Sequence, residues 1–250
     1  GFTSTGLGYP DWVKAFMPGM REIMAGTGML INAAEPAFDR VAVHWSQPSE
    51  HGSEYDKRYG VTKDTHDALL QAFERIVIDP DYVTSKSMQE MLRARDYGIF
   101  FVPTSLAISP QDVASFRGFA ERGGVLVTDL GCGTLTGHCK PRESGALDEL
   151  LGISTDRSDP ELRDLDFEAG LPMALDIEQA KILPTFEATD AGVLAKDEDG
   201  LPLVTARSVG EGTVIALNFS LGEVLSKLDS DAGNVLVRQI LDTADIQPRV

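Results

Sequence analysis

The chain has 250 residues, of which 42% are hydrophobic and 24% charged, as expected for a globular protein with a sizeable core. Its 39 acidic and 22 basic residues give a formal charge of −17, and so acidic a surface repels phosphate backbones, which excludes nucleic acid as an expected partner. No stretch approaches the roughly 20 apolar residues that a membrane-spanning helix needs, so we expect no membrane partner.

Residues 1–36 form an entry segment that differs from the rest of the chain. Between Asp11 and Ala25, apolar side chains such as Trp12 and Phe16 recur at helical spacing. Pro18-Gly19 interrupts this pattern, which predicts one or two short helices that pack on another surface.

Residues 37–130 alternate between predicted strands and predicted helices. Apolar runs rich in β-branched residues predict the strands, and helical periodicity between capping residues and glycines predicts the helices. This alternation is typical of an open, mostly parallel, doubly wound sheet. The expected elements are strand Arg40–Trp45, helix Thr62–Arg75 capped by Thr62 or Asp64, an extended piece Asp79–Thr84, helix Ser87–Arg95, strand Ile99–Val102, a helix from Ser109-Pro110 to Gly123-Gly124 and strand Val125–Thr128.

The C-terminal part follows a different pattern. After a Gly-rich loop (130–145) and a short helical piece (146–151), the segment 192–220 contains three apolar runs separated by Asp199-Gly200 and Gly210-Glu211-Gly212, which predicts a β-meander. A last helix is expected at 231–242. Residues 37–250 are therefore predicted to form a flavodoxin-like three-layer α/β/α sandwich, with a mostly parallel sheet and an antiparallel C-terminal addition.

Polar and aromatic side chains follow three of the predicted strands. His44 and Trp45 end the first strand, Ser105 follows the third, and Asp129 follows the fourth, with Cys132 in the same loop. In a parallel sheet these loops open on one edge, where α/β folds hold ligands. We predict a ligand-binding pocket here, in which Trp45 would stack on a pyranose and His44 and Asp129 would bind hydroxyl groups. The alternative, that Trp45 packs on a neighbouring domain or subunit, is the one that we favour for this residue.

The two cysteines, Cys132 and Cys139, are expected to be free thiols in a reducing compartment, which favours a cytoplasmic protein. Cys132 could act as a nucleophile with His138, although such pairs usually come from different loops. The same three residues lack the spacing of a zinc site. We expect no metal and no cofactor.

Five segments carry a family resemblance: VAVHW, YGIFFVPTSLAIS, FAERGGVLVTD, SGALDELLGI and LPLVTARSVGEGTVIALNF. Their order and spacing resemble the trimerisation domain of the glycoside hydrolase family 42 β-galactosidases, which has a class I glutamine-amidotransferase-like fold. Asp129 stands where an amidotransferase would carry its nucleophilic cysteine, so glutaminase activity is not expected. In the family, the catalytic acid and nucleophile are glutamates on a separate barrel.

The resemblance implies that residues 37–250 are an amidotransferase-like domain and that residues 1–36 are the connector from a preceding catalytic barrel. This chain would then be a non-catalytic domain that forms homo-oligomers such as trimers and shapes the active site of a β-galactosidase-like enzyme. Trp12, Phe16, His44 and Trp45 are the expected interdomain contacts. Two alternatives are a stand-alone module that binds a sugar or small molecule at the carboxyl edge, and a hydrolase that uses Cys132.

Overall fold

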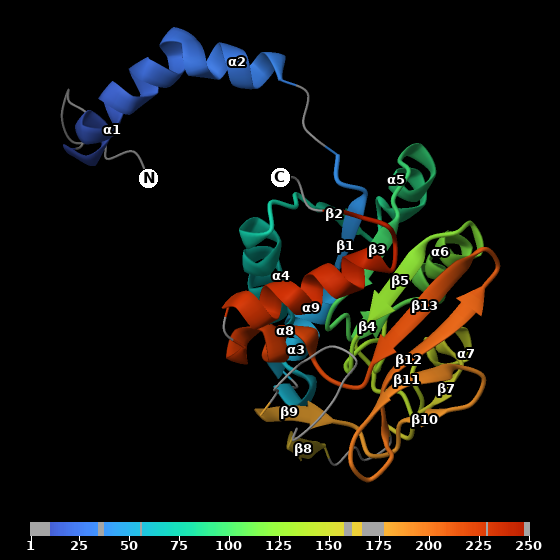
Figure 1. The fold of residues 1–250 in the computed structure, drawn as a ribbon. Helices are drawn as coiled ribbons and strands as arrows, with labels where there is room; N and C mark the ends of the chain where they lie inside the picture. The colour runs from blue at the N-terminus through green and yellow to red at the C-terminus, as the bar shows by residue number, and fades with distance from the viewer. Residues whose placement is uncertain are drawn as a thin grey trace. The chain divides into compact units, whose positions relative to one another are not determined.

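The computed structural model describes residues 11–34, 38–55, 57–157, 162–166, 178–228 and 230–247. The chain divides into two units, Gly1–Ala37 and Phe38–Val250, which are described separately (Figure 1). Parts of the predicted connector, residues 1–10 and 35–36, lie outside the described residues.

The first unit is helical. It contains α1 (Asp11–Glu22), a π-helical stretch η1 (Ile23–Thr27) and α2 (Gly28–Ala33). Pro18 lies inside α1, so of the two predicted arrangements, one short helix or two, a single helix runs through Pro18-Gly19. No residue of this helix is buried, so water can bind the carbonyl group that loses its hydrogen bond to the proline.

The second unit is built on a seven-stranded sheet with the order β11-β12-β13-β5-β3-β1-β2. The five strands from β2 to β13 in this order are parallel, and β12 and β11 continue the sheet antiparallel. This arrangement confirms the predicted fold class. The strands are β1 (Val41–Trp45), β2 (Asp81–Thr84), β3 (Ile99–Val102), β5 (Val125–Thr128), β11 (Gly192–Lys196), β12 (Pro202–Val209) and β13 (Gly212–Leu217).

Helices cover both faces of this sheet, because successive strand residues alternate between two apolar cores. Val43 and Phe101 pack on one side with Phe73 of α4. Phe100 packs on the other side with Phe116 of α6. The first core includes side chains of α4, α8 and α9, and the second those of α5, α6 and α7 (Figure 1). The helices are α3 (Gln47–Tyr55), the 3-10 turn η2 (Lys57–Tyr59), α4 (Thr62–Arg75), α5 (Met88–Ala94), α6 (Pro110–Glu121), α7 (Asp148–Leu151), α8 (Leu221–Lys227) and α9 (Ser230–Asp242).

Three small two-stranded sheets complete the described part of the unit. One of them joins two loops at the carboxyl edge of the main sheet, and includes part of the predicted Gly-rich loop. The pairs are β4 (Ala107–Ile108) with β6 (Leu135–Thr136), β7 (Ile153–Ser154) with β10 (Glu187–Ala188), and β8 (Arg163–Asp166) with β9 (Glu178–Ile182).

Two helix starts test the predicted caps. Before α6, the Ser109 side chain accepts a hydrogen bond from the Asp112 N–H, and the Asp112 carboxylate accepts one from the Ser109 N–H, with Pro110 in the first turn. Before α4, the N-cap is Val61, and no side chain caps it. The predicted Thr62 cap is wrong because the Thr62 hydroxyl instead donates to the Thr104 carbonyl at 2.9 Å. None of the described helices is both long and apolar enough to cross a bilayer.

Candidate functional site

The carboxyl edge of β1 and β3 is the topological switch point of the sheet, because the chain continues to β2 on one side and to β5 on the other. Folds of this kind bind ligands there. In this chain, buried hydroxyl groups at the edge form hydrogen bonds to one another and to the backbone. The Thr62 hydroxyl donates to the Thr104 carbonyl, Thr65 Oγ1 lies 3.0 Å from Thr104 Oγ1, and Ser49 Oγ accepts from the Ala107 N–H at 2.9 Å. The edge is therefore filled by the protein's own side chains.

His44 belongs to this filled edge. Its imidazole is fully buried, with Nδ1 2.8 Å from Ser105 Oγ and the ring edge-on to Phe116. Burial lowers its pKa to about 4, with Asp112 opposing the shift, so the ring is neutral at pH 7. A side chain enclosed in this way is not on the domain surface, which corrects the expectation that His44 contacts a neighbouring domain.

Asp129 ties three segments together. Its Oδ1 accepts from the Thr104 N–H at 2.6 Å, and its Oδ2 accepts from the Thr104 hydroxyl at 3.1 Å and from the Leu221 N–H at 3.2 Å. Burial raises its pKa to about 6, while these hydrogen bonds act in the opposite direction. The carboxylate therefore joins the loops after β3 and β5 to the start of α8.

Cys132 is buried beside this carboxylate. Its thiol donates to the Val102 carbonyl and lies 3.4 Å from Asp129 Oδ1. Burial and the nearby carboxyl group raise the pKa of the thiol well above its ordinary value, so Cys132 is not a thiolate at neutral pH. His138, by contrast, is exposed. This arrangement does not favour the Cys132–His138 nucleophile, and the described residues contain no cluster of three or more His, Cys, Asp or Glu side chains fit to hold a metal.

The backbone strain at this edge falls on Thr104. Its φ is +41°, a left-handed conformation that a β-branched residue adopts only at a cost. Asp129, in the loop after β5, does not have a positive φ. The strained residue thus holds the Asp129 carboxylate rather than presenting a nucleophile.

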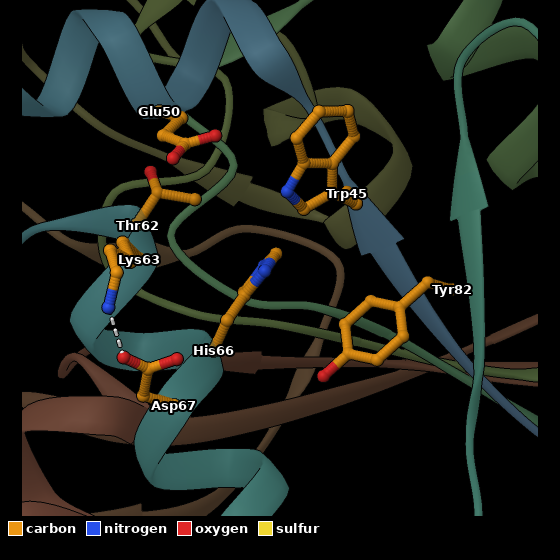
Figure 2. Close-up of a pocket in the computed structure, with 7 residues that line it drawn as sticks. All are labelled: Trp45, Glu50, Thr62, Lys63, His66, Asp67 and Tyr82. Atoms are coloured by element: carbon orange, nitrogen blue, oxygen red, sulfur yellow. Dashed lines mark hydrogen bonds and ion pairs between the residues drawn. The ribbon is translucent and has the colours of Figure 1, made fainter. Parts of the chain in front are cut away.

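An open pocket lies next to this edge, on the other side of β1. It has a volume of about 370 Å³, and Figure 2 shows the side chains that line it. Among the five predicted site residues, only Trp45 lines it. The lining residues are Trp45, Glu50, Thr62, Lys63, His66, Asp67 and Tyr82.

The register of the sheet explains which residues meet in this pocket. Val43 pairs with Tyr82, so Tyr82 lies on the same face as Trp45, two residues further along β1. His44 lies between them in sequence and points to the opposite face, toward Phe116. The structure therefore pairs His44 with Ser105 and Asp129 with Cys132, and places Trp45 in a separate pocket. Whether any of these residues contacts a ligand remains a prediction.

His66 and Tyr82 were missed in the sequence. His66 follows Thr62 by one helical turn in α4, so both lie on the same side of that helix. The helical periodicity of residues 62–75 therefore held a signal for His66, but nothing in the sequence aligns Tyr82 with Trp45.

The parallel strand order and the closed carboxyl edge define a class: a doubly wound, flavodoxin-like α/β domain with a buried, hydrogen-bonded aspartate, Asp129, in the loop after β5. Residues 39–247 match the sequence profile of the β-galactosidase trimerisation domain, and the chain belongs to that family. The resemblance predicted from the five segments is thereby confirmed.

Solved structures of low sequence identity share this fold. The β-galactosidase from Bacillus circulans sp. alkalophilus is 18% identical with a TM-score of 0.64, over 84% of this chain and 31% of that one. The polyextremophilic β-galactosidase from the Antarctic haloarchaeon Halorubrum lacusprofundi is 17% identical with a TM-score of 0.66, over 86% and 32%. The exo-β-1,4-mannosidase Op5Man5 from Opitutaceae bacterium strain TAV5 is 14% identical with a TM-score of 0.51, over 84% and 36%. The chain thus spans about a third of these relatives, and no curated protein sequence matches it.

Proposed function

We propose that this chain is a non-catalytic domain that assembles a β-galactosidase-like glycoside hydrolase into homo-oligomers such as trimers and shapes its active site. The observation that carries the proposal is the closed carboxyl edge. Asp129 and Cys132, in the loop after β5, are both buried and hydrogen-bonded within the domain. A family member with this edge acts through its surfaces.

The two carboxylates of the open pocket do not provide a glycosidase pair. A general acid is kept protonated by an apolar, water-excluded setting. Asp67 is exposed and forms an ion pair with Lys63 on the preceding turn of α4, so it does not lie in such a setting. Glu50 therefore lacks a second carboxyl group that is suited to act as the acid.

The helical unit supports a role in contact with a catalytic barrel. Helix α1 buries none of its own residues, and its Trp12 and Phe16 expose 72% and 57% of their surface. Such an exposed apolar face favours a partner. We propose that these two side chains pack on the barrel of the parent enzyme, and that the domain acts in the cytoplasm, where two unpaired cysteines stay reduced.

The experiment that tests this proposal is the solution mass of the purified chain, measured by size-exclusion chromatography with light scattering over a range of concentrations. A mass three times the 27.0 kDa of one chain supports the proposal. A monomer at every concentration contradicts self-assembly by this domain. In parallel, hydrolysis of a chromogenic β-galactoside by the chain alone would contradict the non-catalytic role.

A variant of α1 distinguishes contact with the catalytic barrel from contact between copies of this chain. The double substitution W12S/F16S removes the two aromatic side chains of α1 and leaves Phe38–Val250 unchanged. If these residues contact the barrel, the variant keeps the mass of the parent chain. A shift to monomer would show that α1 holds the copies together instead.

A further inference from the structure

The pocket beside β1 combines aromatic walls with polar side chains. Trp45 ends β1 and Tyr82 lies on β2, while His66, Lys63 and Asp67 come from α4 (Figure 2). All of these residues belong to Phe38–Val250, so this unit forms the pocket by itself. Its volume of about 370 Å³ is in the range of small-ligand sites.

The aromatic side chains leave surface available to a ligand. Tyr82 is 41% exposed and Trp45 is half-buried, although both lie on the face of the sheet that elsewhere forms a core. In Figure 2 the His66 ring points from α4 toward the space between the Trp45 and Tyr82 rings. Rings of this kind offer an apolar face for stacking and a polar tip for hydrogen bonds.

His66 supplies an unpartnered polar atom. Its side chain lines the pocket and only 7% of the residue is exposed, yet Nε2 has no hydrogen-bond partner. Burial keeps the ring neutral by lowering its pKa to about 4, whereas Asp67 and the backbone of His44 oppose the shift. A buried polar atom without a partner is rare in proteins, and it is satisfied when a ligand brings a complementary group.

The charges of the pocket restrict the class of that ligand. Glu50 and Asp67 carry two negative charges, and Lys63, which is paired with Asp67, carries the single positive charge. An anion would face a net negative lining. A ligand with hydroxyl groups can donate to the carboxylates and bond to His66, and a ring with an apolar face can stack on Trp45.

We propose that the pocket formed by Trp45, His66 and Tyr82 binds a neutral pyranose sugar, such as a free monosaccharide or the terminal residue of an oligosaccharide. This site is separate from the assembly function, and nothing in its chemistry requires the sugar to be cleaved.

The two tryptophans of the chain allow a direct test. The variant W12F leaves Trp45 as the single tryptophan, so its fluorescence reports on the pocket. Galactose, glucose and lactose are titrated into W12F, and into W45F, in which Trp12 alone emits. We expect at least one sugar to give a saturable change in W12F and none in W45F. No saturable change in W12F with any of the three sugars would overturn the proposal.

Binding by the full chain is then compared between variants by saturation-transfer NMR. W45A should bind about tenfold more weakly, because it loses the stacking surface. The control is Y55A, since Tyr55 is 95% exposed and does not line the pocket, and it should bind like the parent chain. Circular dichroism checks that each variant is folded. Equal affinity in W45A and the parent chain would overturn the proposal even if a sugar binds. The assembly of the chain is tested separately by its solution mass, so the sugar-binding results do not affect that test.

Discussion

The backbone N–H of Thr104 lies 2.6 Å from Oδ1 of Asp129, so the loop after β3 is bonded to the loop after β5. The other oxygen of the same carboxylate accepts from the Leu221 N–H at the start of α8. One buried side chain thus holds together three segments that are distant in sequence. The role of Asp129 is structural, because both of its carboxylate oxygens accept hydrogen bonds from protein donors.

Replacing Asp129 by asparagine should destabilise the domain. Asparagine offers one acceptor oxygen, so its NH₂ group would face either the Thr104 N–H or the Leu221 N–H. A buried donor left unpaired costs about 1–3 kcal/mol, and we expect a loss of that size in urea unfolding. The control is D190N: Asp190 is exposed and lies 3.8 Å from Arg207, so it should change stability by less than about 0.5 kcal/mol. Equal effects of the two variants would refute the role of Asp129.

Buried histidine should make the protein sensitive to acid. His66 has a pKa of about 4 in the folded state, against 6.5 ordinarily. Between these values the unfolded chain binds a proton that the folded chain does not, so stability rises with pH through this window and falls on acidification. The full slope for one proton is about 1.4 kcal/mol per pH unit.

The variant H66Q removes this contribution. Its stability should fall less than that of the parent chain between about pH 6.5 and pH 4. The matched control is H51Q: His51 is exposed on α3, so H51Q should follow the parent curve. Asp129 contributes with the opposite sign, because its folded pKa of about 6 is raised and its ionisation opposes folding as the pH rises. Parallel curves for H66Q and the parent chain would contradict the predicted burial of neutral His66.

The two cysteines should differ in reactivity. Cys139 is exposed, whereas Cys132 is buried and its thiol donates to the Val102 carbonyl. Iodoacetamide at neutral pH should modify Cys139 alone in the native chain, and both cysteines in urea. Peptide mass spectrometry locates the label. Fast native labelling of Cys132 would revive the hypothesis that it is a nucleophile.

Gly212 should not accept a side chain. A Cβ atom there would lie 2.3 Å from the Gly124 carbonyl oxygen and 2.4 Å from the Ala120 carbonyl oxygen, where β13 meets the end of α6. We expect G212A to lose about 1–3 kcal/mol or more in urea unfolding, because backbone on both sides must shift. The matched control is G192A, where the new atom would lie 3.6 Å from the nearest neighbour. If the two variants are equally stable, β13 does not pack as described.

The segment from Tyr97 to Asp129 was predictable because its signals are local. Two buried strands, a Ser109-Pro110 helix start and a Gly123-Gly124 stop all act within a few residues of the elements that they define, and β3, α6 and β5 follow them. The fold class could be predicted from such units. The sequence left open whether Pro18 divides the first helix, because an exposed helix can tolerate a proline, which depends on its surroundings rather than on the local sequence.

The candidate site was harder to predict because it depends on side-chain direction and register. His44 and Trp45 are neighbours in sequence, but their side chains leave β1 on opposite faces of the sheet. The pairing of Val43 with Tyr82, which sets Tyr82 beside the pocket, joins two strands that are separated by two helices. The sequence around residues 44–45 does not indicate that Val43 pairs with Tyr82.

The position of β13 between β5 and β12 has a consequence for how the protein is made. Thr213 pairs with Val125, so the hydrogen-bonding edge of β5 stays open while all the residues between them leave the ribosome. An open, apolar strand edge can pair with other chains. The main sheet is therefore completed late in translation, and a chain that stalls before residue 212 leaves the edge of β5 open to pairing with other chains.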